Sequence, residues 1–168
     1  GRVEETYGED PCLSADMGVS FVKNFERMGV ITTPKHFVAN SGDGGRDSNP
    51  IHYTERFLEE THLVPFKACF QQGGSQSVMT AYNMLDGTPC TANSWLNIEK
   101  LRKEWGFDGF TIADADAVGI IHKLHHTMGN WAEAAATAVN NGLDVIFQTT
   151  YEEHEPFLEA CRSGLITE

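Results

Sequence analysis

GFDGFTIADADAV, residues 106–118, is the stretch of this sequence that decides the fold. A glycine-bounded turn leads into an apolar run, Phe110 to Ile112, and two carboxylates follow it, Asp114 and Asp116. A strand inside a parallel sheet is covered on both faces and therefore needs a continuous apolar run. In α/β barrels and open α/β sheets the chemistry lies at the carboxyl ends of such strands. Asp114 is therefore the first candidate for a catalytic residue, with an N-cap of the following helix as the alternative.

Three other segments have the composition of short buried strands, namely residues 30–37 (VITTPKHF), 77–82 (SVMTAY) and 143–147 (LDVIF). Helices are expected between them at 14–28 with Ser14 as N-cap, 54–72 with Thr54 as N-cap and a break near Pro65, about 94–105, from Asn130 to Gly142, and between Pro156 and Gly164. In the 14–28 helix the large apolar side chains, Met17, Phe21, Phe25 and Met28, share one face. The remaining segments are expected to be loops.

The spacing of the strand ends, at His36, Tyr82, Asp114 and Phe147, suits successive βα units. Such units form a parallel sheet with right-handed crossovers. The chain has 168 residues without a linker-like segment, so we expect one continuous unit. A complete (β/α)8 barrel needs ~250 residues, so four strands make about half of one. A doubly wound open sheet is the competing fold, but it usually carries a GxGxxG turn, and none follows a strand here.

Acidic residues outnumber basic ones, 24 against 12, for a formal net charge of −12. Nucleic acids and anionic membrane surfaces bind proteins with a positive footprint. We therefore expect no nucleic-acid and no membrane partner, and a neutral or cationic partner fits better. No apolar run reaches the ~18 residues that a membrane-spanning helix needs.

The cysteines are widely scattered and form no CxxC pair; they are Cys12, Cys69, Cys90 and Cys161. Zinc binding is therefore not expected, and buried free thiols are. The sequence begins Gly-Arg-Val and ends on a helix-like segment, so we expect a piece of a larger protein. The compartment stays open.

Polar side chains follow three of the expected strands, Lys35 and His36 at the first, Tyr82 and Asn83 at the second, and Asp114 at the third. Neighbouring barrel strands would bring these groups to one mouth. A cation, an imidazole, a phenol and a carboxylate around a cup suit a polyhydroxyl ligand, because each can hold one or two hydroxyl groups. A surface pair at a loop start is the alternative for Lys35 and His36, and a buried structural phenol is the alternative for Tyr82.

Two other chemistries fit the sequence less well. A cluster of His122, His125 and His126 near the two aspartates could hold a divalent ion, but no HExxH pattern is present. A serine hydrolase would need a GxSxG elbow, which is absent. We expect no metal and no cofactor.

The motifs also resemble one known family. The stretches GRVEETYGEDP (1–11), TPKHFVAN (33–40), ERFLEETHLVPFK (55–67), SVMTAYNMLDGTPCTAN (77–93) and LRKEWGFDGFTIADADAV (101–118) are similar, in this order, to the catalytic domain of glycoside hydrolase family 3. The resemblance implies that residues 1–168 are part of a single α/β domain, a partial (β/α)8 TIM-like barrel comprising roughly strands 3 to 7 with their helices. It implies a retaining β-glycosidase, of β-glucosidase or β-xylosidase type, with periplasmic or secreted location expected and cytoplasmic location open.

By position, the resemblance implies that Asp114 is the nucleophile and that Arg2, Lys35 and His36 hold sugar hydroxyls. Tyr82 matches the tyrosine beside the nucleophile. Asp116 would then hold the loop or cap the next helix. The family's acid/base usually comes from a following domain, which this chain lacks, so the remainder of the same protein is expected as a partner. The fragment alone should be inactive.

The chain departs from the family pattern beside the nucleophile. Ala113 and Ala115 flank Asp114 where members often carry serine and an aromatic residue or cysteine. The Asp-Ala-Asp-Ala-Val run resembles xylosidase-like members, and the missing KHFPGHG signature disfavours the N-acetylglucosaminidase branch. A terminal β-linked glucose or xylose is the implied substrate. A catalytically silent carbohydrate-binding relative is the alternative.

Overall fold

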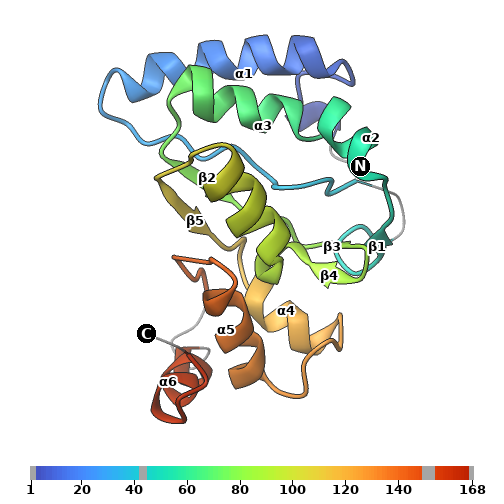
Figure 1. The fold of residues 1–168 in the computed structure, drawn as a ribbon, viewed down its shortest axis with the longest axis vertical. Helices are drawn as coiled ribbons and strands as arrows, with labels where there is room; N and C mark the ends of the chain where they lie inside the picture. The colour runs from blue at the N-terminus through green and yellow to red at the C-terminus, as the bar shows by residue number, and fades with distance from the viewer. Residues whose placement is uncertain (1–2, 42–44, 149–153, 167–168) are drawn as a thin grey trace.

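The computed structural model describes residues 3–41, 45–148 and 154–166 (Figure 1). The helical elements are η1 (Val3–Glu5), α1 (Pro11–Glu26), α2 (Glu55–Glu60), α3 (Val64–Ala68), η2 (Cys69–Gly73), η3 (Cys90–Ala92), η4 (Trp95–Glu104), α4 (Ala117–Lys123), α5 (Trp131–Asn140) and α6 (Glu155–Arg162). The strands are β1 (Pro50–Ile51), β2 (Ser77–Met79), β3 (Met84–Leu85), β4 (Thr88–Pro89) and β5 (Phe110–Ile112). None of these helices is long and apolar enough to cross a bilayer.

The centre of the molecule is a row of short parallel segments. β2 pairs with β5 in parallel, with Met79 opposite Ile112. Phe37 bridges to Thr80 beyond the end of β2, and Val145 bridges to Ile112 on the other side of β5. The four segments therefore lie side by side in chain order, as the spacing predicted, and they form an open, partial α/β barrel. Helices α1 and α3 pack together at one end of this row, and α4, α5 and α6 pack in turn at the other (Figure 1).

The two outer segments are shorter than predicted. Residues 30–37 and 143–147 contribute one bridge each instead of a strand. Pro34 interrupts the first segment because it has no backbone N–H to donate, although its carbonyl accepts from the Met79 N–H at 3.1 Å. In the second segment the carbonyls of Val145 and Phe147 accept hydrogen bonds from the β5 side. Within the described ranges each outer segment thus has a pairing partner on one side only. This is why each forms a single bridge instead of a regular strand.

α1 begins three residues earlier than the predicted start at Ser14. The Asp10 side chain accepts hydrogen bonds from the N–H groups of Cys12 and Leu13, at 2.8 and 2.9 Å, and Pro11 occupies the first turn. A capping aspartate followed by proline is a stronger start than an isolated serine. The prediction of Ser14 as N-cap was therefore wrong.

The predicted 54–72 helix is divided, as the proline indicated. Thr54 caps α2 by accepting from the Phe57 N–H at 3.2 Å. A turn at Thr61 ends α2, and α3 restarts with Pro65 in its first turn. α3 then continues into the wider turns of η2.

A helix and a hairpin were not predicted. The segment after Asp116 was expected to be a histidine-rich loop, but α4 occupies Ala117–Lys123. The segment after Asn83 was expected to be a long loop, but β3 and β4 form a hairpin that also pairs with β1. Asp86 and Gly87, at φ values of 49° and 81°, form its two-residue turn, and Asp-Gly is a preferred pair for such turns.

The start of α5 was predicted correctly. The Asn130 side chain accepts from the Glu133 N–H at 2.9 Å, as an N-cap does. The alanine-rich face of α5 packs against α4 and Ala113 in one apolar cluster. A second cluster surrounds Phe37 and Trp105 and includes Val78 of β2. The core is therefore divided into two clusters, one that contains β2 and one that begins at Ala113, just beyond β5.

The large apolar face of α1 is exposed rather than buried. Its buried residues are small, Ala15, Gly18 and Val22. A Cβ at Gly18 would lie 2.9 Å from the Cys69 Sγ, so glycine is what permits this close packing on η2. On the opposite side each of the following is at least 41% exposed: Leu13, Met17, Phe21, Phe25 and Met28.

All four cysteines are free. Cys69 and Cys90 are buried, and burial raises the pKa of their thiols to about 11 and about 12. Cys12 and Cys161 are exposed, so the expectation of buried thiols holds for only two of the four.

Candidate active site

The candidate active site centres on a contact between His36 and Asp114. Asp114 lies just beyond β5, and His36 immediately precedes the Phe37 bridge to β2. The His36 Nε2 atom lies 3.1 Å from Asp114 Oδ2, and the two side chains are only 11% and 13% exposed. β2 lies between the two segments, so parallel pairing on both of its edges brings these distant residues together at the carboxyl end of the row.

Hydrogen bonds hold the Asp114 carboxylate in its ionised form. Its Oδ1 atom accepts from the Ala115 N–H at 2.7 Å, while Oδ2 faces His36. Burial alone would raise the pKa of Asp114, but the hydrogen bonds from His36 and from the Ala115 N–H outweigh it and leave the pKa below its ordinary value. The side chain is therefore an anion near neutral pH. It does not cap α4, whose N-cap position belongs to Asp116.

Asp116 has a different environment from Asp114. It adopts a left-handed conformation with φ of 60°, and its side chain makes no capping hydrogen bond. Its backbone N–H donates to the Phe147 carbonyl at 2.9 Å. Its main chain thus joins the β5 end to the neighbouring segment, in keeping with a loop-holding position rather than a capping one.

Tyr82 lies beside the carboxylate. Its hydroxyl donates to the Ala115 carbonyl at 2.7 Å. Burial raises the pKa of Tyr82 above its ordinary value, and the negative charges of Asp114, Asp47 and Asp116 raise it further. The phenol therefore stays protonated and remains a hydrogen-bond donor. The adjacent Asn83 is fully buried and donates to the Val38 carbonyl at 3.3 Å, so it belongs to the core.

One of the predicted sugar-binding residues, Lys35, is not brought to the carboxylate by this structure. Lys35 is exposed, and within the described part of the chain no ion pair joins it to Asp114. Arg2 lies outside the described residues. Among the described residues, His36 and the Ala115 N–H favour the ionised form of Asp114.

Sequence reasoning missed the role of one histidine at this site. The His125 Nε2 atom lies 3.0 Å from the Asp47 carbonyl oxygen, joining the end of α4 to the 40–50 loop. His122 instead contacts the Met128 carbonyl through Nδ1 at 3.1 Å. Among residues 3–41, 45–148 and 154–166, no three His, Cys, Asp or Glu side chains are grouped so that they could hold a metal ion. The sequence carries no signal for the His125 contact, because its acceptor is a backbone carbonyl.

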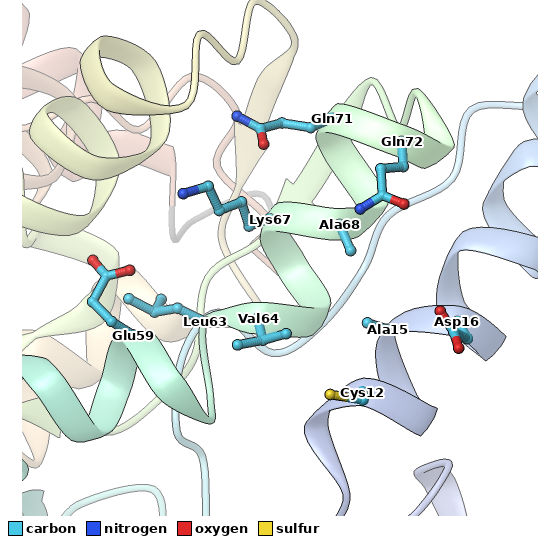
Figure 2. Close-up of a pocket in the computed structure, with 10 residues that line it drawn as sticks. All are labelled: Cys12, Ala15, Asp16, Glu59, Leu63, Val64, Lys67, Ala68, Gln71 and Gln72. Carbon is cyan, nitrogen blue, oxygen red and sulfur yellow. The ribbon is translucent and has the colours of Figure 1, made fainter.

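A separate pocket of about 390 Å³ lies between α1 and the α2–α3 segment (Figure 2). Its polar side chains include Asp16, Glu59 and Lys67, and apolar groups such as Leu63 and Ala68 complete the lining. None of His36, Tyr82 or Asp114 lines it. The pocket is therefore distinct from the candidate active site.

The fold and the site together define a class of protein. Parallel segments joined by helices, with a buried ionised aspartate and a protonated phenol at their carboxyl ends, are typical of an α/β-barrel domain that binds and transforms a polar ligand. The family profile described as the glycosyl hydrolase family 3 N terminal domain matches residues 1–168. The chain therefore belongs to glycosyl hydrolase family 3.

Individual relatives agree with this assignment. A β-xylosidase from Formosa agariphila is 40% identical over 86% of this chain and 21% of its own length. A periplasmic β-glucosidase from Salmonella typhimurium is 35% identical over 99% of this chain and 22% of its own length. The solved structure of β-glucosidase 3B from Thermotoga neapolitana in complex with glucose superposes with a TM-score of 0.83 at 34% identity, covering 99% of this chain and 22% of that one. The chain thus spans about a fifth of the length of these relatives.

Proposed function

We propose that this chain carries the nucleophile half of a retaining β-glycosidase, with Asp114 as the nucleophile. The observation that carries the proposal is the His36–Asp114 contact at 3.1 Å, in which a nearly buried carboxylate is kept ionised. A retaining glycosidase needs such an anion because the nucleophile attacks the anomeric carbon of the sugar. The strand-end position of Asp114 is also where barrel enzymes present their reactive groups.

The reaction proceeds in two displacements. A carboxylate oxygen of Asp114 forms a bond to the anomeric carbon as the bond to the leaving oxygen breaks, and a general acid protonates that oxygen. Water then attacks the glycosyl-enzyme, a general base takes its proton, and Asp114 is released as a carboxylate. His36 orients Asp114 through its Nε2 atom, and Tyr82 fixes the following peptide through Ala115.

Substrate recognition would rest on the groups around the carboxylate. His36, Lys35 and Arg2 are proposed to bind hydroxyl groups of the sugar, and Tyr82 is proposed to lie beside the anomeric carbon. The second carboxyl group should lie about 5–5.5 Å from Asp114 in a retaining enzyme. We assign this acid/base to a part of the protein outside the 168 residues, because the chain spans about a fifth of its relatives' length.

The proposed substrate is a terminal, non-reducing β-linked glucose or xylose. One relative is named a β-xylosidase and another a periplasmic β-glucosidase, and a third was solved with glucose. Ala115 leaves no aromatic wall next to the nucleophile, which is compatible with either sugar. A periplasmic or secreted location is proposed on the same grounds.

Trapping of the glycosyl-enzyme tests the nucleophile directly. The protein expressed from its complete reading frame is incubated with 2-fluoro-β-glucosyl and 2-fluoro-β-xylosyl fluorides, and the adduct is located by peptide mass spectrometry. We expect a single adduct on Asp114 and none in an Asp114→Asn variant. An adduct on another residue, or no adduct while glycosides are being cleaved, would reject the assignment. A protein that binds β-glycosides without cleaving them would be a silent carbohydrate-binding relative.

A further inference from the structure

His125 joins the two sides of the candidate active site. It follows the last residue of α4 by two positions, and its own N–H donates to the Ile120 carbonyl at 3.0 Å, which fixes it to the end of that helix. Its side-chain Nε2 lies 3.0 Å from the Asp47 carbonyl oxygen. A carbonyl oxygen can only accept, so the Nε2 atom of His125 carries the proton. The contact ties the helix that follows Asp114 to the loop that follows His36.

The backbone of Tyr82 also contacts the His125 ring. Burial lowers the pKa of His125, and polar contacts with the backbones of Asp47 and Tyr82 offset only part of that effect. The ring is therefore neutral at neutral pH, in the tautomer that donates from Nε2. Three parts of the chain meet at one ring, namely the end of α4, the loop at Asp47 and the segment at Tyr82.

The loop segment that His125 holds is ordered by its own hydrogen bonds. The N–H groups of Ser48 and Asn49 both donate to the Gly45 carbonyl, at 3.0 and 2.8 Å. The negative charge of Asp47 also contributes to raising the pKa of Tyr82, so this segment lies near the phenol. A turn held together by its own hydrogen bonds is expected to shift as a unit when its contact with His125 is lost.

We infer that His125 is a positioning residue that holds the Asp47 turn against Tyr82 and thereby shapes the sugar-binding side of the site. The inference rests on the proposed glycosidase function and deepens it. His125 does not touch the sugar or the reacting atoms. Its loss should weaken binding of the sugar ring, while the chemistry at Asp114, which His36 orients independently, is largely retained.

The test compares two amide substitutions of His125 that differ in side-chain length, made in the protein expressed from its complete reading frame. In His125→Gln the side-chain amide can take the place of Nε2, and in His125→Asn it is too short to do so. We expect His125→Asn to raise KM for p-nitrophenyl β-glycosides about fivefold to tenfold with kcat changed less than about twofold, the effect of one lost hydrogen bond on binding. His125→Gln should restore KM to within about twofold of the unaltered protein.

His122→Leu is the matched control, because His122 makes the same kind of contact from the same helix but to Met128. It should leave KM unchanged even if it lowers the melting temperature. Dissociation constants for a non-hydrolysable p-nitrophenyl 1-thio-β-glycoside, measured by calorimetry, give a second readout that does not need turnover. The positioning role would be overturned if His125→Asn had the same dissociation constant and KM as the unaltered protein. It would also be overturned if the variant lowered kcat and left KM unchanged. An unaltered protein that neither cleaves nor binds these glycosides would instead overturn the proposed function, and the positioning role with it.

Discussion

The His36 Nε2 atom and the Asp114 Oδ2 atom lie 3.1 Å apart, although one residue lies in the first parallel segment and the other follows the third. The contact depends on β2, which pairs with both segments. Within the described ranges the imidazole is the one basic side chain within 4 Å of the Asp114 carboxylate, and it is slightly more buried than its partner. The charge state of the carboxylate is therefore set partly from across the sheet, by His36, and partly within its own loop, by the Ala115 N–H.

Removal of this imidazole should shift the acid limb of the pH–activity profile. In His36→Leu the carboxylate loses a hydrogen bond that favours its ionised form, so the pKa of Asp114 rises. Asp114 then loses its proton only at higher pH, and the acid limb of kcat/KM moves upward. Activity at neutral pH should fall at least about tenfold as well. A pH–rate profile of the complete protein measures both effects.

His52→Leu is the control for this prediction. His52 and Asp86 form a similar pair at 3.0 Å, but both are exposed on the β1–β3–β4 sheet. Its loss should leave the acid limb in place. A His36→Leu profile that coincides with the unaltered one would show that His36 does not set the charge of Asp114.

Lys100 should be important for stability. Its side chain is only 9% exposed, and its ammonium group forms ion pairs with Glu55, Glu59 and Glu104. Because these carboxylates are partly solvated, we expect Lys100→Met to cost about 1–3 kcal/mol, measured by thermal unfolding. Burial opposes the charge, but the three carboxylates outweigh it and raise the pKa of Lys100. Because the pKa is raised, the charged lysine contributes its full stabilisation at pH values below the unfolded pKa of about 10.4. This contribution is lost as the pH rises through the pKa of the folded state.

Lys103→Met is the matched control on the same helix. Lys103 pairs with Glu99 at 2.7 Å, but its side chain is 65% exposed. Exposed pairs of this spacing contribute about 0.3–0.5 kcal/mol. Similar losses for the two variants would contradict the importance given to burial of Lys100.

Gly109 should be intolerant of a side chain. A Cβ at this position would lie 2.2 Å from the Gln76 backbone oxygen, which accepts the hydrogen bond of the Phe110 N–H. Alanine there would push β5 away from β2 and move Asp114 relative to Tyr82. We expect Gly109→Ala to cost more than about 2 kcal/mol and to lower kcat.

Gly129→Ala provides the comparison for Gly109→Ala. Its Cβ would meet only the end of the flexible Glu133 side chain, at 3.0 Å. Thermal unfolding and kcat should both stay close to those of the unaltered protein. A Gly109→Ala variant that behaves in the same way would mean that the two strands have room to separate.

The exposed face of α1 should behave differently in the isolated 168 residues and in the complete protein. An open apolar face of this size promotes association. We expect the isolated chain to self-associate, as measured by light scattering, and to hydrolyse no p-nitrophenyl glycoside. Phe21→Glu should reduce association of the isolated chain but destabilise the complete protein, in which the face is expected to be covered. Clear hydrolysis by the isolated chain would place an acid/base within it.

Local signals in the sequence were enough to predict several elements. Thr54 and Asn130 accept hydrogen bonds from their own helices, so their capping depends only on neighbouring residues. β5 was predicted from its apolar run, because a fully covered strand leaves a continuous pattern. The parallel order of the segments followed from their spacing.

Other features depend on choices that local patterns do not settle. Asp10 and Ser14 both have capping side chains, and the Asp10–Pro11 pair was the better start for α1. The large apolar side chains of α1 share one face in the sequence, but it is the small residues on the other side that allow η2 to pack closely. The His125–Asp47 contact joins residues far apart in the chain through a backbone carbonyl, and no side-chain pattern records an acceptor of that kind.

The hydroxyl of Tyr82 is anchored on the main chain of residue 115 and takes nothing from its side chain. The frame around the nucleophile is thereby independent of which amino acid stands at this position. If Asp114 is the nucleophile as proposed, substitutions at residue 115 should alter the side chain next to the bound sugar while this hydrogen bond stays in place. Preference among sugars could then change through residue 115 without loss of the Tyr82 anchor.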